Sequence, residues 1–70
     1  MAHIDAQIAG TVWRVEVSPG DHVDAGQTVI VLESMKMEMP VEAEDEGTVR
    51  AVLVQEGQAV AEGDHLVDLE

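Results

Sequence analysis

Residues 10–33 read GTVWRVEVSPGDHVDAGQTVIVLE and residues 47–70 read GTVRAVLVQEGQAVAEGDHLVDLE, so one pattern occurs twice with an offset of 37 positions. Ten positions are identical between the copies: Gly10/Gly47, Thr11/Thr48, Val12/Val49, Val15/Val52, Val17/Val54, Gly20/Gly57, Val23/Val60, Gly26/Gly63, Leu32/Leu69 and Glu33/Glu70. Two copies are too few for an open solenoid, which needs roughly three or more stacked repeats. We therefore expect the two halves to face each other across a pseudo-twofold axis and to share one core.

Each copy has the pattern of short β-strands separated by turns. Val15 and Val17, like Val52 and Val54, recur with period two and should fall on one face of a strand. The stretch SPGD at residues 18–21 has the form of a type II turn, because proline fixes φ and the following glycine accepts a positive φ. The second copy repeats this turn without the proline.

A second glycine in each copy marks a further turn. Gly26 and Gly63 are each followed by an apolar strand, at residues 28–32 and 65–69. The stretch EAEDE at residues 42–46 has a helix-forming composition but is too short to stand alone as a helix, so we expect a solvated link between the halves. The pattern predicts a single all-β domain over residues 1–70, built as a small sandwich or flattened barrel with an internal duplication.

Lys36 is the only lysine of the chain, and it lies between the two copies in the segment ESMKME at residues 33–38. Residues 28–34 and 37–41 read as two successive strands, which leaves Met35-Lys36 or Lys36-Met37 for a two-residue hairpin turn. Such a turn requires positive φ, and strain of about 1 to 3 kcal/mol per residue of that kind tends to be kept at functional positions. The pseudo-twofold symmetry places this hairpin at one end of the molecule and the chain termini at the other.

Composition excludes several classes of function. The formal net charge is −12, with Arg14 and Arg50 as the only cations besides Lys36, which argues against nucleic acid or an anionic membrane as a partner. The chain has no cysteine, so it has neither disulfides nor thiolate metal sites. No secretory signal and no stretch near 18 apolar residues is present, and we expect a cytoplasmic protein.

The segment ESMKM at residues 33–37, with Pro40 after it and duplicated strands on either side, resembles a biotinyl domain over nearly the whole chain. The resemblance implies a flattened barrel of two four-stranded antiparallel sheets, with biotin joined through an amide to Lys36. It also implies that the modifying ligase recognises Met35 and Met37, with Glu33 and Ser34 as further matched positions. Serine stands at position 34 where alanine is commoner in the family. The protruding insertion of some bacterial members is missing.

The resemblance implies a carrier and not an enzyme. Biotin protein ligase would modify Lys36, and the biotin would then carry a carboxyl group from a biotin carboxylase to a carboxyltransferase. Such a domain is expected to be a monomer when isolated. The initial methionine and the lack of an Ala/Pro-rich linker predict a free-standing carrier protein, although an excised domain would look nearly the same.

Two other functions remain open for this fold. Lipoyl domains are similar to biotinyl domains and also modify a hairpin lysine, but their motif is typically Asp-Lys-Ala, whereas methionine flanks Lys36 on both sides. An unmodified structural module of the same fold is the other alternative.

Several residues have ordinary structural explanations. Met39 is expected in the core, and Trp13 is expected to be partly buried on the face of Val15 and Val17. His3, His22 and His65 are not joined by a short ligand spacing, so we expect no metal site.

Overall fold

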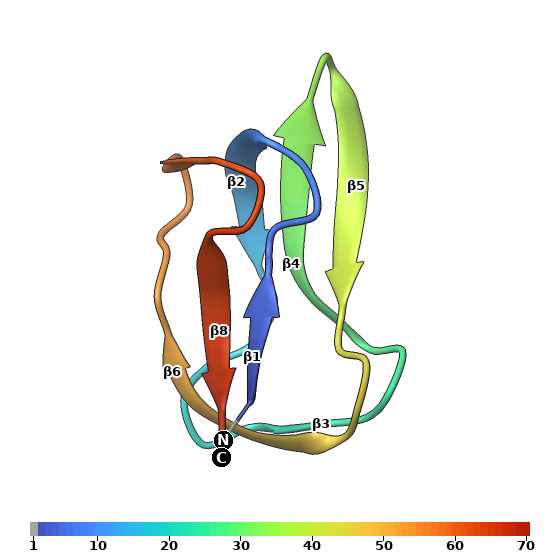
Figure 1. Cartoon of the computed structure of the whole chain (residues 1–70), viewed down its shortest axis with the longest axis vertical. Helices are drawn as coiled ribbons and strands as arrows, with labels where there is room; N and C mark the ends of the chain where they lie inside the picture. The colour runs from blue at the N-terminus through green and yellow to red at the C-terminus, as the bar shows by residue number, and fades with distance from the viewer. Residues whose placement is uncertain (1) are drawn as a thin grey trace.

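The computed structural model describes residues 2–70, and over this range the chain forms strands and turns without a helix. The strands are β1 (Ala2–Asp5), β2 (Gly10–Val15), β3 (His22–Val23), β4 (Thr28–Ser34), β5 (Met37–Glu42), β6 (Gly47–Val52), β7 (Ala59–Val60) and β8 (His65–Leu69). They form two four-stranded antiparallel sheets, with the strand orders β1-β8-β6-β3 and β5-β4-β2-β7 (Figure 1). The predicted all-β sandwich is confirmed. Nothing in the described range could cross a membrane as a helix.

The two sheets are related by the same offset of 37 residues that relates the sequence copies. β2 corresponds to β6, β3 to β7 and β4 to β8, and the strand order is the same in both sheets. The remaining pair is β1 and β5, in which Ile4 aligns with Val41, and directly after these strands Ala6 aligns with Ala43; all four residues are buried. The structural repeat therefore extends beyond residues 10–33 and 47–70, and it includes the strand that follows Lys36.

Backbone hydrogen bonds join the two halves in the same symmetric way. The Val12 N–H donates to the Gln58 carbonyl at 2.8 Å, and the Val12 carbonyl accepts from the Gly57 N–H at 2.7 Å. The equivalent Val49 exchanges the same two bonds with the turn at residues 20–21, both at 2.8 Å. Each half thus uses a central strand residue to hold a turn of the other half.

Turns of one kind recur in the part of the chain that the structure describes, and each contains a glycine with φ between 85° and 95°. In the first, the Asp21 N–H donates to the Ser18 carbonyl at 3.0 Å, which confirms the predicted type II turn. The last side chain of each turn also accepts a hydrogen bond from the N–H of the first residue. These side chain and backbone pairs are Asp21 with Ser18, Gln27 with Asp24, Gln58 with Gln55, and Asp64 with Ala61.

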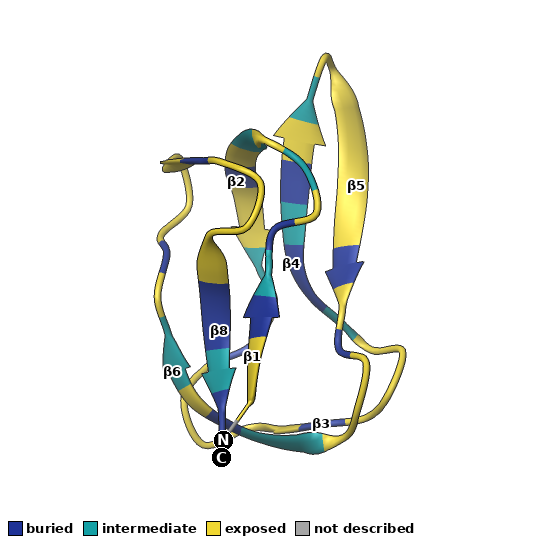
Figure 2. Cartoon of the chain, viewed as in Figure 1, coloured by how far each residue is buried: buried dark blue, intermediate teal, exposed yellow. Residues whose placement is uncertain are grey.

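The core lies between the sheets and takes apolar side chains from both (Figure 2). Full burial of such a side chain contributes about 1.5–3 kcal/mol. The largest fully buried side chains are those of Val12, Val23, Val29, Ile30, Leu32, Val49, Leu66 and Val67. The chain therefore builds its core almost entirely from β-branched and leucine side chains, as strands that bury one face require.

The first predicted strand is less regular than period two implies. Val17 is buried, but Val15 is half-buried, because a β-bulge interrupts the pairing of β2 with β4 between Val12 and Arg14. The bulge takes Trp13 out of the alternation and leaves 43% of it exposed. The Arg14 guanidinium lies 5.1 Å from the centre of the Trp13 ring.

The predicted solvated link at residues 42–46 is only partly correct. Glu42 is the last residue of β5, and Ala43 is buried. The Ala43 N–H donates to the Gln27 carbonyl at 2.9 Å, and its carbonyl accepts from the Gly26 N–H at 2.7 Å. Only residues 44–46 form an exposed connection.

The molecule is elongated, with principal extents of 31 × 19 × 18 Å. The hairpin between β4 and β5 projects from one end of the long axis, while the start of β1 and the C-terminus lie at the other (Figure 1). This arrangement confirms the prediction made from the pseudo-twofold symmetry.

Gly10 and Gly47 are equivalent in the repeat but differ in the atoms that surround them. A Cβ atom at Gly10 would meet the Glu33 carbonyl oxygen at 2.7 Å, whereas one at Gly47 would meet nothing nearer than the Leu69 side chain at 3.7 Å. We expect Gly10→Ala to lower the free energy of unfolding by about 1–3 kcal/mol, since the backbone at Glu33 must move. Urea denaturation measures this difference.

Gly47→Ala is the matched control, and it should leave stability unchanged or raise it by up to about 1 kcal/mol. Equal effects of the two substitutions would contradict the close approach at Glu33.

Candidate functional site

Lys36 lies in the two-residue turn of the β4–β5 hairpin. Ser34 pairs with Met37 across the two strands, so Met35 and Lys36 are the central residues of the turn. Their φ angles are 52° and 65°, which is the left-handed conformation that a type I′ turn requires at both positions. Of the two registers that the sequence leaves open, the structure therefore has Met35-Lys36 at the tip. Neither residue is of the Asn or Gly type that adopts this conformation at low cost.

The tip extends beyond the body of the domain. Met35 is 93% exposed and Met37 is 63% exposed. Within residues 2–70, the Lys36 side chain makes neither a hydrogen bond nor an ion pair. The amine is thus presented to solvent with nothing to displace before another protein can reach it.

The two faces of the hairpin differ in chemistry. Met39 lies opposite Leu32 and therefore on the side of the core, and Met37 follows on the same side by period two. Glu33 lies opposite Glu38, and both are exposed on the other side. A partner that approaches the tip meets methionine on one face and two carboxylates on the other.

The predicted core position of Met39 is wrong. Its side chain is directed to the core side, but 39% of the residue is exposed. The cause is the position of β5 at the edge of its sheet, since Leu32, its partner on the inner strand β4, is fully buried. The hairpin tip beyond this pair projects from the end of the domain (Figure 1).

The five predicted site residues, 33–37, all lie at the end of this one hairpin. Ser34 is half-buried and faces the end of β2, where a Cβ atom at Gly10 would lie 3.6 Å from the Ser34 Cβ. A small residue is therefore suited to position 34, and serine meets that condition as alanine does.

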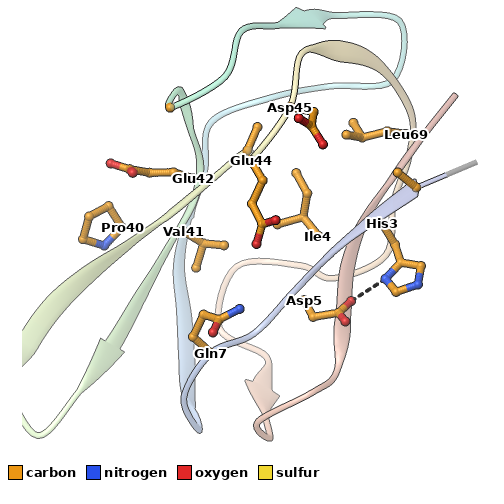
Figure 3. Close-up of a pocket in the computed structure, with 13 residues that line it drawn as sticks. His3, Ile4, Asp5, Gln7, Pro40, Val41, Glu42, Glu44, Asp45 and Leu69 are labelled. Carbon is orange, nitrogen blue, oxygen red and sulfur yellow. Dashed lines mark hydrogen bonds and ion pairs between the residues drawn. The ribbon is translucent and has the colours of Figure 1, made fainter.

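An open groove of about 730 Å³ lies between the edge strands β1 and β5 (Figure 3). Residues 33–39 do not line it, so the groove is separate from the hairpin tip. Its lining combines apolar side chains such as Ile4 and Val41 with the carboxylates of Glu42, Glu44 and Asp45.

The described chain also brings together side chains that the sequence keeps apart. His3 and His65 have ring centres 4.0 Å apart, and both Nδ1 atoms lie near the same Asp5 oxygen. The pairing of β1 with β8 produces this cluster. In the sequence, only the two-residue spacing of His3 and Asp5 indicates this cluster.

Comparisons with known proteins agree with the geometry of the hairpin. A family model for biotin/lipoyl domains, described as "Biotin-requiring enzyme", matches residues 2–69. The chain belongs to the biotin/lipoyl family.

Two curated relatives and one solved structure place this biotin/lipoyl domain among its neighbours. The biotin/lipoyl attachment protein of Bacillus subtilis is 47% identical over 66 residues, covering 94% of this chain and 90% of that protein. The biotin carboxyl carrier protein of Streptococcus mutans is 42% identical over 64 residues, covering 91% of this chain and 49% of that protein. The lipoyl domain of the 2-oxoglutarate dehydrogenase complex from Azotobacter vinelandii superimposes with a TM-score of 0.76 at 28% identity, covering 96% of this chain and 95% of that domain.

The conformation of the turn in this biotin/lipoyl domain leads to a stability prediction. The double substitution Met35→Asn/Lys36→Gly supplies the residues that a type I′ turn favours. We expect it to raise the free energy of unfolding by about 1 kcal/mol, which corresponds to an increase in Tm of about 4–8 °C for a domain of this size. Thermal and urea denaturation measure the gain.

The control is Met35→Ala/Lys36→Ala, which removes both side chains but keeps a Cβ atom at each left-handed position. It should bring no gain. A double Asn-Gly variant no more stable than this control would show that the tip is not strained.

Proposed function

We propose that Lys36 is covalently biotinylated and that the domain is a biotin carboxyl carrier. The observation that carries the proposal is an exposed, unengaged lysine at the tip of a left-handed turn, between two exposed methionines, in a member of the biotin/lipoyl family. The 42% identity to a biotin carboxyl carrier protein supports biotin as the cofactor and a carboxyl group as its cargo.

The residues of the tip fit a covalent attachment by a separate ligase. The neutral Lys36 amine attacks the carbonyl carbon of a biotinyl adenylate, AMP leaves, and the amine proton passes to the ligase or to solvent. Within residues 2–70 no base contacts Lys36, so the ligase must supply the deprotonation. Met35 and Met37, with Glu33 and Ser34, form the surface that we expect the ligase to recognise.

When bound, biotin supplies a ureido nitrogen that accepts and releases a carboxyl group. The contribution of the domain is to hold that group far from its own body, at the end of a molecule 31 Å long. We expect the domain to visit a biotin carboxylase and a carboxyltransferase in turn, without catalysing either step. A docked or linked carrier presents the cofactor at high effective concentration to both sites.

Three finer features stay predictions from the sequence. These are the cytoplasmic location, the monomeric state of the isolated domain, and its service to a separate carboxylase. The chain spans 90% of one carrier-like relative but only 49% of another, so the arrangement of the whole assembly belongs to the proposal.

Lipoate is the second candidate cofactor, because the fold superimposes on a lipoyl domain with a TM-score of 0.76. The flanks of Lys36 favour biotin, since a charged residue before the lysine and a small residue after it are typical of the lipoyl motif. Here both neighbours are long apolar side chains. The two cofactors add different masses, so one measurement separates them.

The test is intact-mass analysis of the protein produced with and without biotin ligase and biotin. We expect one biotin-sized addition in the wild type and none in Lys36→Arg, which keeps the charge and much of the length of the side chain. Streptavidin binding should follow the mass. A lipoyl-sized addition would promote the second candidate, and no addition at all would favour an unmodified structural module.

Lys36→Arg also needs a folding control. The unmodified wild type and the variant should have the same Tm within about 2 °C, because the exposed tip buries almost no apolar surface. Biotin that persists in Lys36→Arg would contradict the assignment of the site.

A further inference from the structure

A cluster of two imidazoles and one carboxylate lies on the pairing of β1 with β8, away from the hairpin tip. Asp5 Oδ1 is 2.7 Å from His3 Nδ1 and 2.6 Å from His65 Nδ1. His3 and Asp5 are two residues apart and so lie on one face of β1, and Asp5 is opposite His65 in the register of the sheet. The side chains of His3, Asp5 and His65 are 48%, 32% and 54% exposed, so ions can reach them from solvent.

The internal duplication provides a comparison within the molecule. Asp5 and His65 correspond to Glu42 and Thr28, which are paired across β5 and β4 just as Asp5 and His65 are paired across β1 and β8. His3 corresponds to Pro40. The equivalent strand pair, β5 with β4, therefore forms without an imidazole at these positions, so the fold itself does not require the histidines.

The three side chains match the ligand set of a transition metal. Their ligand atoms lie within 4.8 Å of one another. In a tetrahedral zinc site with bonds of about 2.0–2.2 Å, ligand atoms are separated by about 3.3–3.6 Å, so the two contacts to Asp5 need to widen by about 0.6–1 Å. Exposed side chains can make that adjustment by small rotations. A neutral imidazole offers Nδ1 to a metal when its proton is on Nε2.

We propose that His3, Asp5 and His65 bind a divalent transition-metal ion of the zinc class through His3 Nδ1, His65 Nδ1 and one carboxylate oxygen of Asp5. Three protein ligands leave the fourth tetrahedral position for water or for a group from another molecule. Mixed nitrogen and oxygen ligands suit zinc, nickel and copper, whereas calcium and magnesium take oxygen ligands alone. This site revises the expectation from the sequence that the histidines form no metal site.

The electrostatics of the cluster agree with a metal site. The Asp5 carboxylate places a negative charge between the two imidazoles, within 2.7 Å of both Nδ1 atoms. The surrounding net charge of −12 attracts cations as well. A bound ion would join the edge strand β1 to β8, and it would stabilise the fold because the unfolded chain does not hold these residues together.

A second group, His22, Asp24 and Glu46, is the weaker candidate. It has one imidazole instead of two, and His22 Nε2 is 3.2 Å from Asp24 Oδ1 and 3.8 Å from Glu46 Oε2. The side chains of these residues are 60%, 76% and 76% exposed. This group therefore serves as the internal control.

The test uses the 70-residue chain without a histidine tag, titrated with zinc chloride at neutral pH. Calorimetry should show one saturable site, and NMR should show the ring signals of His3 and His65 shifting while those of His22 stay in place. Zinc at about ten times its Kd should raise Tm by about 5 °C or more. Magnesium at the same concentration should have no such effect.

Two substitutions remove ligands with little change to the fold. Asp5→Asn is isosteric, and His65→Thr introduces the residue that the other half carries at Thr28. Both should abolish the saturable site. His22→Ala, which introduces the residue that the other copy carries at Ala59, should keep it. Lys36→Arg should also keep it, so the outcome is independent of the proposed carrier function.

Either of two results would overturn the proposal. One is a wild-type protein whose imidazole signals and Tm do not respond to zinc, which would leave the cluster as a set of hydrogen bonds only. The other is zinc binding that survives in Asp5→Asn and His65→Thr but is lost in His22→Ala, which would move the site to His22.

Discussion

The exchange of backbone hydrogen bonds at Val12 and Val49 is the interaction on which the two-sheet arrangement depends. Each of these residues donates its N–H to a turn of the other half and accepts from the same turn. Both side chains are also buried in the shared core. Neither half can therefore close its own sheet alone, because β7 of one copy completes the sheet of β2 and β3 completes the sheet of β6. Docking of the halves and completion of the sheets are one event.

Because these hydrogen bonds and the shared core hold the two halves together, the hairpin tip contributes little to the stability of the fold. The core is formed below the tip, and the turn at Met35-Lys36 contributes exposed side chains in a conformation that costs free energy. A rigid, self-supporting sandwich can tolerate such a turn. The same turn fixes the direction in which Lys36 leaves the domain, because both flanking strands belong to a sheet.

Much of the fold follows from the sequence because the duplication is visible in identical glycines and valines. The offset predicts the equivalence of β2 with β6 and of β4 with β8, and the turn glycines have the positive φ expected of them. The equivalence of β1 with β5 is hidden in the sequence, since the two strands share no identical residue at this offset. The match is revealed by burial and by Ala6 and Ala43, which follow the strands.

Those features of the site that depend on the local sequence could be predicted, and those that depend on the whole fold could not. Lys36 at a two-residue turn follows from the strands on either side, but the exposure of Met39 depends on the position of β5 at the edge of its sheet. The order of the strands in a sheet is set by pairings across the whole sandwich. The cluster at Asp5 depends on a pairing between residues 60 positions apart, for which the sequence contains no periodic signal.

The separation of the tip from the chain ends has a mechanical consequence. Any polypeptide joined to either end of this domain would attach at the pole opposite Lys36, so the whole 31 Å of the domain adds to the radius that the lysine can sweep about its anchor. The body of the sandwich then acts as a stiff arm whose length is set by strand geometry and not by linker entropy. A short connection would thus serve two distant active sites where a flexible chain alone would need many more residues.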